Sequence, residues 1–248
     1  MDNFASRIGA IKAAHLYRVL RTLSTPQGRD VVIDGQRVLL FSSNSYLGLN
    51  TNDHICREGI RAIEEFGVGS GGSRLVTGNM TPHMRLEAAV ARFKGSEAAL
   101  AFTSGYTANV GVISALCHKD TVIFSDALNH ASIIDGCRIS GAEVIVYRHN
   151  DMTDLEQKLA AYASNQTAVK LIVTDGVFSM DGDSAPLADI ATLATRHDAW
   201  LMVDDAHGIG TVGEEGRGSC HAQNVRPELL VVTFGKAFGV SGAAVLCD

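Results

Sequence analysis

From residue 54 onward, stretches with apolar residues at helical spacing alternate with short, continuous apolar runs. The helical stretches cover residues 54–66, 83–93, 107–117, 130–139, 153–162 and 187–197. The apolar runs are Ala98–Phe102, Val122–Phe124, Val144–Tyr147, Leu171–Thr174, Leu201–Val203 and Leu229–Thr233. Apolar strands that alternate with helices are typical of βαβ units, so we predict an α/β fold with a mostly parallel sheet flanked by helices.

The first forty residues follow a different pattern. Residues 4–23 place their apolar side chains mainly on one side of a helix, and Thr25–Gly28 ends that pattern. Asp34-Gly35 then separates two short apolar runs, 31–33 and 38–41, as in a β-hairpin. We therefore expect an N-terminal helix and hairpin segment over residues 1–40 and one large domain over 41–248.

The composition excludes several classes of protein. Of the 248 residues, 46% are hydrophobic and 19% are charged, which is typical of a globular chain rather than a disordered one. The net charge is −6 and no cluster of lysine and arginine is present, which argues against nucleic acid or an anionic membrane as a partner. The five cysteines form no C-x-x-C pair, and the sequence contains no secretory h-region and no apolar run near ~20 residues. We therefore expect a cytoplasmic protein.

Residue types that carry chemistry follow five of the apolar runs. They are Ser104–Thr107, Ser125 and Asp126 with Asn129 and His130, Asp175–Gly182, Asp204–Gly208, and Thr233–Lys236. Ligands of parallel α/β sheets bind at the carboxyl ends of the strands, so these residues are expected to line one rim.

Lys236 directly follows an apolar strand and lies between small residues, with Phe234 and Phe238 nearby. An exposed loop lysine is the simpler interpretation. A partly desolvated lysine, however, has a lowered pKa and becomes a nucleophile for carbonyl groups, so Schiff-base chemistry is the functional interpretation.

Asp204 ends another apolar strand, three residues before His207. A carboxylate at that position needs a partner, and the protonated nitrogen of a pyridine ring is one, with His207 bonded to a hydroxyl of the same ring. A helix-capping aspartate beside an exposed histidine is the simpler interpretation. A metal site that includes Asp205 is a further alternative, although no second cluster of ligands accompanies it.

Two glycine-containing segments suggest different roles. Ser104–Thr107 opens a helix after a strand, where free backbone N–H groups suit a phosphate, although an ordinary serine cap fits as well. Gly67–Gly72 matches G-x-G-x-x-G but follows a helical stretch, so it is not a dinucleotide fingerprint.

A phosphate site, an acid for a ring nitrogen and a lysine for an aldehyde together indicate pyridoxal 5′-phosphate and no metal.

The chain resembles the α-oxoamine synthases, which are pyridoxal-phosphate enzymes of fold type I. The matching runs are Phe41–Leu49, Gly69–Arg74, Asn129–Ser132, Gly176–Asp183, Val203–Gly208 and Thr233–Gly242. Such enzymes condense an amino acid with an acyl thioester and release CO2. Within the family, residues 233–245 and Ser184–Leu187 are most similar to members that use L-alanine and a pimeloyl thioester, so the resemblance implies these substrates. Glycine acetyltransferase and 5-aminolevulinate synthase activities remain alternatives, as do an aminotransferase or lyase and an inactive fragment.

The resemblance also implies individual roles. Lys236 would form the Schiff base with the cofactor and carry the Cα proton, Asp204 would pair with the pyridine nitrogen, His207 with the ring hydroxyl, and His130 would stack on the ring. The remaining cofactor-binding residues would be Gly105, Tyr106, Ser179 and Thr233, and Arg21, Asn44 and His130 would contact the substrates.

Three features of the chain qualify the resemblance. Ser45 stands where the family usually has aspartate, and Asp175 where it often has glutamate. The chain stops at Asp248, twelve residues after Lys236, whereas family members continue into a small C-terminal domain, so we expect an incomplete large domain. Family members are homodimers with shared active sites, and the glycine-rich loop Gly69–Arg74 is expected to lie at that interface.

Overall fold

The computed structural model describes residues 3–162 and 169–248, which divide into two compact units, 1–43 and 44–248. The expected division after residue 40 stays a prediction. Among the described residues, each helix is too short or too polar to cross a bilayer.

The N-terminal helix is shorter than predicted. Helix α1 spans Phe4–Ala13, begins at the Asn3 cap and ends before His15, whose φ of 57° is left-handed. None of the residues of α1 is buried, and Leu20 is 96% exposed. The predicted apolar face therefore has no packing partner within residues 3–43, and a short helix without tertiary packing gains little from extension.

The hairpin is confirmed. Strands β1 (Asp30–Ile33) and β2 (Gln36–Leu39) pair antiparallel around Asp34 and Gly35. Both turn residues have positive φ, 51° and 77°, as a two-residue type I′ turn requires.

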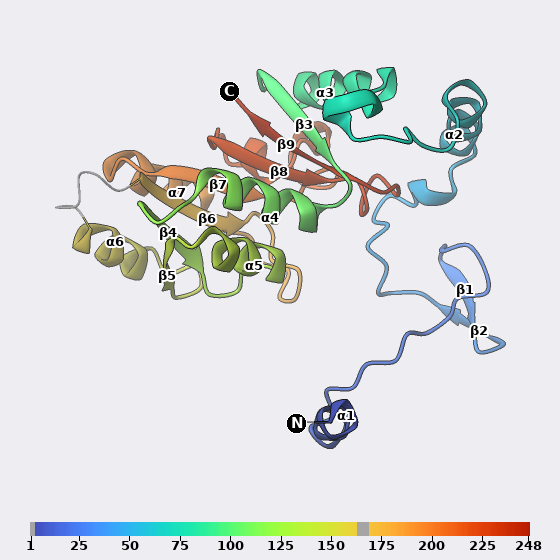
Figure 1. The fold of residues 1–248 in the computed structure, drawn as a ribbon, viewed down its shortest axis with the longest axis horizontal. Helices are drawn as coiled ribbons and strands as arrows, with labels where there is room; N and C mark the ends of the chain where they lie inside the picture. Colours follow the sequence, from blue (N-terminus) through green and yellow to red (C-terminus); the bar gives the residue numbers. More distant parts are fainter. Residues whose placement is uncertain (1–2, 163–168) are drawn as a thin grey trace. The chain divides into compact units, whose positions relative to one another are not determined.

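In the second unit, the predicted parallel sheet is confirmed and one further strand is added. Within the described residues, the strand order is β3-β9-β8-β7-β6-β4-β5 (Figure 1). The strands are β3 (Ala98–Phe102), β4 (Thr121–Asp126), β5 (Glu143–Tyr147), β6 (Val169–Asp175), β7 (Trp200–Asp204), β8 (Leu229–Thr233) and β9 (Ala243–Cys247). Only β9 runs against its neighbours β8 and β3, so the carboxyl ends of the other six strands lie at one edge.

The six helices predicted for the second unit are all present, with ends shifted by at most two residues. They are α2 (Asp53–Phe66), α3 (Thr81–Lys94), α4 (Gly105–Leu116), α5 (Ala131–Ser140), α6 (Met152–Ala161) and α7 (Leu187–Arg196). Shorter turns are η1 (Leu49–Thr51), the π-helical η2 (Arg74–Gly78), η3 (Glu214–Gly216) and α8 (Ser219–Ala222). Helices α3 and α5 end where Gly95 and Gly141 adopt left-handed φ values of 72°.

The sheet is covered on both faces, which explains why its strands are apolar throughout. On one face Phe124, Ile172 and Val203 pack with side chains of α6 and α7. On the other face Ile123 and Met202 pack with side chains of α4 and α5. Alternate residues of each strand thus enter opposite cores, and the strand ends remain for polar residues.

A partly buried histidine, His149, fixes the loop that follows β6. His149 Nδ1 lies 2.9 Å from Asp126 Oδ1, and its Nε2 lies 2.8 Å from Asp183 Oδ2. The His149 ring also packs edge-on against buried Phe178. Carboxylates only accept hydrogen bonds, so both bonds form together when both ring nitrogens carry a proton. Burial works to lower the pKa of His149, but the bonds to Asp126 and Asp183 outweigh it and the pKa is raised.

This arrangement predicts a pH-dependent stability. A histidine with a raised folded pKa contributes stability that is complete below its unfolded value near 6.5 and is lost as pH rises through the folded value. Denaturant unfolding of wild type and His149→Gln across that range should show a stability difference that shrinks as pH rises. Asp183→Asn should show a weaker pH dependence than wild type. A difference that stays constant with pH would contradict the protonated bridge.

Candidate active site

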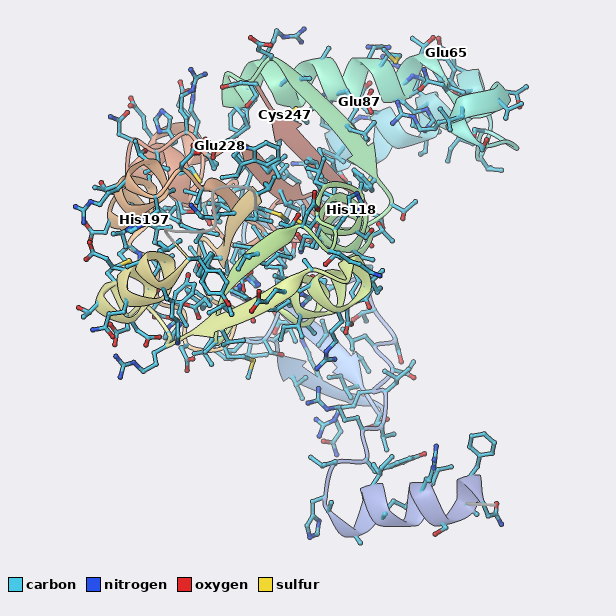
Figure 2. All side chains as sticks on the ribbon, turned by 60° about the vertical axis from the view of Figure 1, so that its left-hand side comes forward. Glu65, Glu87, His118, His197, Glu228 and Cys247 are labelled. Atoms are coloured by element: carbon cyan, nitrogen blue, oxygen red, sulfur yellow. The ribbon has the colours of Figure 1, made fainter. Side chains whose placement is uncertain are left out.

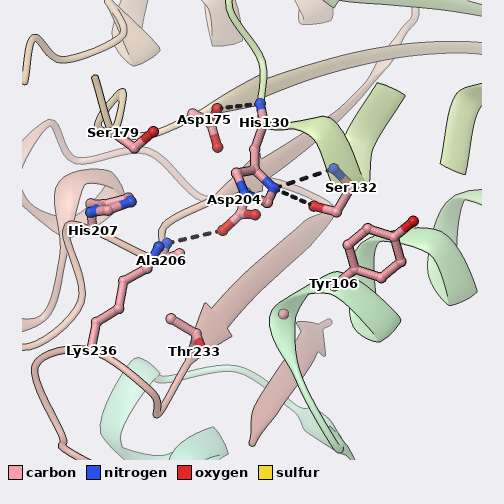
Figure 3. Close-up of a pocket in the computed structure, with 11 residues that line it drawn as sticks. Tyr106, His130, Ser132, Asp175, Ser179, Asp204, Ala206, His207, Thr233 and Lys236 are labelled. Carbon is pink, nitrogen blue, oxygen red and sulfur yellow. Dashed lines mark hydrogen bonds between the residues drawn. The ribbon is translucent and has the colours of Figure 1, made fainter. Parts of the chain in front are cut away.

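One cavity opens at the carboxyl ends of the strands (Figure 3). Its walls come from segments that follow β3, β4, β6, β7 and β8, five of the six strands that end at this edge. It is lined by Gly105, Tyr106, His130, Ser132, Asp175, Ser179, Asp204, Ala206, His207, Thr233 and Lys236. All eight residues predicted for the cofactor and the catalytic steps are therefore brought together in one place.

Lys236 is presented by a tight loop after β8. Phe234 N–H donates to Gly242 O, Val240 N–H to Phe234 O, and Gly239 N–H to Lys236 O. Gly239 has a φ of 69°, and a Cβ there would lie 2.4 Å from Asn50 N, so the backbone approach requires glycine. The loop thus closes on itself and directs the lysine into the cavity.

Burial lowers the pKa of Lys236, and the negative charges of Asp204 and Asp175 offset this only in part. A lowered pKa raises the fraction of neutral amine, which is the nucleophilic form. The predicted desolvation of this lysine is therefore present in the structure.

Asp204 is 4% exposed and each of its carboxylate oxygens has a donor. Oδ1 accepts from Ala206 N–H at 3.0 Å, and Oδ2 accepts from Asn109 Nδ2 at 2.6 Å. The neighbouring Asp205 bonds to the hydroxyl and backbone N–H of Ser219, outside the cavity lining. Among residues 3–162 and 169–248, no three histidine, cysteine or acidic side chains are grouped so as to hold a metal.

His207 lies beside Lys236 in the cavity wall. Burial, with Lys236 and His130 adding positive charge, lowers the pKa of His207 to about 4, so the ring is neutral at pH 7. Its Nδ1 lies 2.6 Å from the Tyr46 hydroxyl, which leaves Nε2 for a ligand. Sequence reasoning missed Tyr46 as a site residue, although it belongs to the run Phe41–Leu49.

The two predicted substrate residues outside this lining differ in position. Asn44 Oδ1 lies 3.4 Å from the Tyr46 hydroxyl, so Asn44 reaches the cavity only through Tyr46 and His207. Arg21 belongs to the unit of residues 1–43. Its contact with an acyl substrate stays a prediction.

His130 and Asp175 are joined at the opposite wall. The backbone N–H of His130 donates to Asp175 Oδ2 at 2.8 Å (Figure 3). Burial, followed by the charge of Asp204, raises the pKa of the Asp175 carboxyl. Asp175, which was expected at this rim as part of Asp175–Gly182 and departs from the family pattern, is part of the cavity wall.

Helix α4 begins at the edge of the cavity. Ser104 Oγ accepts from Thr107 N–H at 3.1 Å, so the serine caps the helix as the sequence predicts. A Cβ on Gly105 would lie 3.7 Å from Thr233 Cβ, which places the first turn of α4 against the end of β8. The first N–H groups of a helix have no partner within it and attract anions.

The G-x-G-x-x-G run lies in a different setting. It connects α2 to η2 and α3, with no strand before it, so it lacks the dinucleotide-binding context. Arg74, two residues after it, bonds to Glu87 of α3, which is labelled in Figure 2, and Glu87 also accepts from Ala101 N–H of β3. This ion pair ties the end of the loop to the sheet.

A family model for the class I and II aminotransferases matches residues 36–248. The chain is 50% identical to the 8-amino-7-oxononanoate synthase of Geotalea daltonii over 98% of its own length and 62% of that protein's. It is 60% identical to a protein of Desulfovibrio desulfuricans whose name provisionally assigns it the same activity, over 100% of this chain and 66% of that protein. The chain thus spans slightly less than two thirds of these curated relatives.

Solved structures are also similar. A serine palmitoyltransferase from S. paucimobilis with a bound PLP–myriocin adduct superposes with a TM-score of 0.91 at 33% identity, over 100% of this chain and 63% of that one. An 8-amino-7-oxononanoate synthase from Francisella tularensis superposes with a TM-score of 0.69 at 29% identity, over 84% and 58%. The predicted fold type I architecture is therefore confirmed.

Proposed function

The chain belongs to the class I and II aminotransferase family, and we propose that it is the larger part of an 8-amino-7-oxononanoate synthase of biotin biosynthesis. The reaction joins L-alanine to a pimeloyl thioester, and it releases CO2 and the thiol carrier. The observation that carries the proposal is the cavity in which Lys236, Asp204 and His207 face the first turn of α4. Pyridoxal 5′-phosphate is the cofactor that this donor set fits.

Each functional group of pyridoxal phosphate can be compared with the residues that line the cavity. A desolvated lysine suits an aldehyde, and a buried carboxylate suits a protonated ring nitrogen. The neutral imidazole of His207 can donate or accept at a ring hydroxyl, with Ser179 on the same side of the cavity (Figure 3), and the helix start beside Thr233 suits a phosphate.

Individual residues of the chain would have separate roles in the reaction. Pyridoxal phosphate, when bound, supplies an aldehyde that reacts with amines and a protonated ring that withdraws electrons from the α-carbon of the amino acid. Lys236 would hold the aldehyde carbon and carry the proton at the substrate α-carbon. Asp204 would keep the ring nitrogen protonated, and His130 would cover one face of the ring. Asn44 and Arg21 would contact the substrates.

Two activities are supported by specific similarities. The curated relatives at 48–60% identity favour L-alanine and a pimeloyl thioester. The structural similarity to serine palmitoyltransferases, at 33% identity, favours L-serine and a long acyl thioester as the second candidate. The higher sequence identity supports the first candidate.

The assay measures CO2 and ketone product from the intact protein with L-alanine, glycine or L-serine. Each amino acid is paired with acyl thioesters of increasing length, on coenzyme A and on acyl carrier protein. We expect the highest kcat/KM with L-alanine and the pimeloyl thioester. Preference for L-serine and a long chain would select the second candidate, and release of an α-keto acid without CO2 would contradict both.

The five cysteines form no disulfide among the described residues, which fits the cytoplasm as the site of this reaction.

We further propose a two-fold homodimer with the glycine-rich loop at its interface. Exposed apolar residues gather on α2, η2 and α3, among them Ile60, Ile63, Leu75, Val76 and Met84. Exposed apolar patches of this kind mark interaction surfaces. Light scattering of the intact protein should give twice the chain mass at micromolar concentration. Val76→Glu should shift it to the monomer and lower activity, whereas a fully active wild-type monomer would contradict the shared site.

A further inference from the structure

Two buried side chains outside the predicted site connect Asp204 to His130. Asn109 on α4 and Ser132 on α5 have no exposed surface. Asn109 Nδ2 lies 2.6 Å from Asp204 Oδ2 and 2.9 Å from Ser132 Oγ. Ser132 Oγ lies 2.7 Å from His130 Nδ1, and Ser132 N–H donates to the same nitrogen at 3.2 Å. A continuous chain of hydrogen bonds therefore joins Asp204 to His130, and Figure 3 shows its last part, the bonds between Ser132 and His130.

The chemistry of the groups fixes the direction of each bond. A carboxylate oxygen accepts, so Asn109 must turn its NH2 group toward Asp204. The second N–H of that group donates to Ser132 Oγ. Since Ser132 Oγ accepts from Asn109, its own hydroxyl hydrogen is available for His130 Nδ1.

His130 Nδ1 thus faces two donors, the hydroxyl and the backbone N–H of Ser132. A ring nitrogen that accepts hydrogen bonds carries no proton in the neutral ring, so the proton lies on Nε2. The backbone N–H of Ser132 already makes Nδ1 an acceptor, and the Asn109 amide adds to this by leaving the Ser132 hydroxyl hydrogen free to donate to the same nitrogen.

A second observation supports this orientation. Asn109 Oδ1 is buried and has no hydrogen-bond partner among the described residues. A buried carbonyl without a partner is destabilising. The amide nevertheless keeps its NH2 group on Asp204 and Ser132. This indicates that these two hydrogen bonds outweigh the cost of leaving the Asn109 carbonyl without a partner.

We propose that Asn109 and Ser132 are positioning residues that hold His130 in the Nε2–H tautomer and couple its orientation to Asp204. The catalytic consequence rests on the proposed function, because His130 would cover the ring whose nitrogen Asp204 holds. The tautomer itself does not depend on that function.

The test records the ring ¹⁵N signals of the intact protein labelled at its histidines, at a pH where His130 is neutral. His130→Gln identifies the signals of His130. In wild type, Nδ1 should give the signal of an unprotonated nitrogen and Nε2 that of a protonated one. Ser132→Ala removes one donor and should shift the tautomer ratio toward Nδ1–H by roughly three- to tenfold, the effect of one side-chain hydrogen bond.

Matched variants separate this role from a purely structural one. Ser132→Thr keeps the hydroxyl donor and should keep the wild-type ratio. Ser114→Ala removes a serine on α4 whose hydroxyl bonds to Val110 O, and it should leave the His130 signals unchanged. A wild-type proton on Nδ1, or an unchanged ratio in folded Ser132→Ala, would overturn the proposal. Because the measurement needs neither cofactor nor substrate, an inactive protein with the expected tautomer would refute only the proposed function.

Discussion

Replacement of Lys236 by alanine is expected to lower kcat by more than about 10⁴-fold, beyond the usual contribution of one proton-transfer group. The reason is that one side chain carries two roles, attachment of the cofactor aldehyde and transfer of the substrate α-proton. Its amine is the one lysine amine in the cavity lining, and burial lowers its pKa. Turnover of the intact protein with L-alanine and the pimeloyl thioester, before and after addition of methylamine, measures the loss and its partial rescue.

Lys119→Ala serves as the matched control for this variant. Lys119 is an exposed lysine in the turn before β4, away from the cavity lining. Its replacement should leave kcat and KM unchanged. Activity of Lys236→Ala within tenfold of wild type would remove Lys236 from the reaction.

Replacement of Asp204 by asparagine is expected to retain the cofactor and to lower kcat by ~10² or more. A neutral amide cannot hold the proton on the ring nitrogen, and a charged hydrogen bond at a site of developing charge is worth ~3 kcal/mol. The fold should persist, because the asparagine oxygen can still accept from Ala206 N–H, and its NH2 group can donate to Asn109 Oδ1 once that amide turns over. Steady-state kinetics and cofactor absorbance together separate loss of chemistry from loss of binding.

The adjacent acid provides the control. Asp205 is also buried, but it bonds to Ser219 and does not line the cavity. Asp205→Asn should lower stability and leave the turnover of the folded molecules unchanged. Near-normal turnover in Asp204→Asn, or an equal loss in both variants, would refute the role of Asp204.

The sequence predicts most of the helices and strands of the second unit because the apolar pattern of each element agrees with the way that element packs in the fold. Strands such as Leu171–Thr174 are apolar on both faces, which only a sheet covered on both sides can satisfy. The carboxyl ends of parallel strands share one edge, so the positions of Asp204, Lys236 and His130 in the sequence were enough to place them together.

Other features depend on contacts that periodicity does not reveal. The helix predicted over 4–23 ends at Ala13, because its apolar pattern lacks a packing partner in its own unit. In the sequence, Asn109 is a polar residue within a mostly apolar helical stretch. Its hydrogen bond to Asp204 exists only because the fold brings the two residues together. Tyr46 likewise reaches His207 across 161 positions of sequence, so no local pattern could assign it to the site.

Reduction of the cofactor-loaded protein with borohydride, followed by peptide mapping, tests the central claim most directly. The reagent converts the bond between a lysine and the cofactor aldehyde into a stable link, so the modified peptide identifies the lysine. The account predicts a pyridoxyl group on the peptide that contains Lys236 and none in Lys236→Ala. A label on another buried lysine, such as Lys94 or Lys170, or the same label in Lys236→Ala, would contradict it.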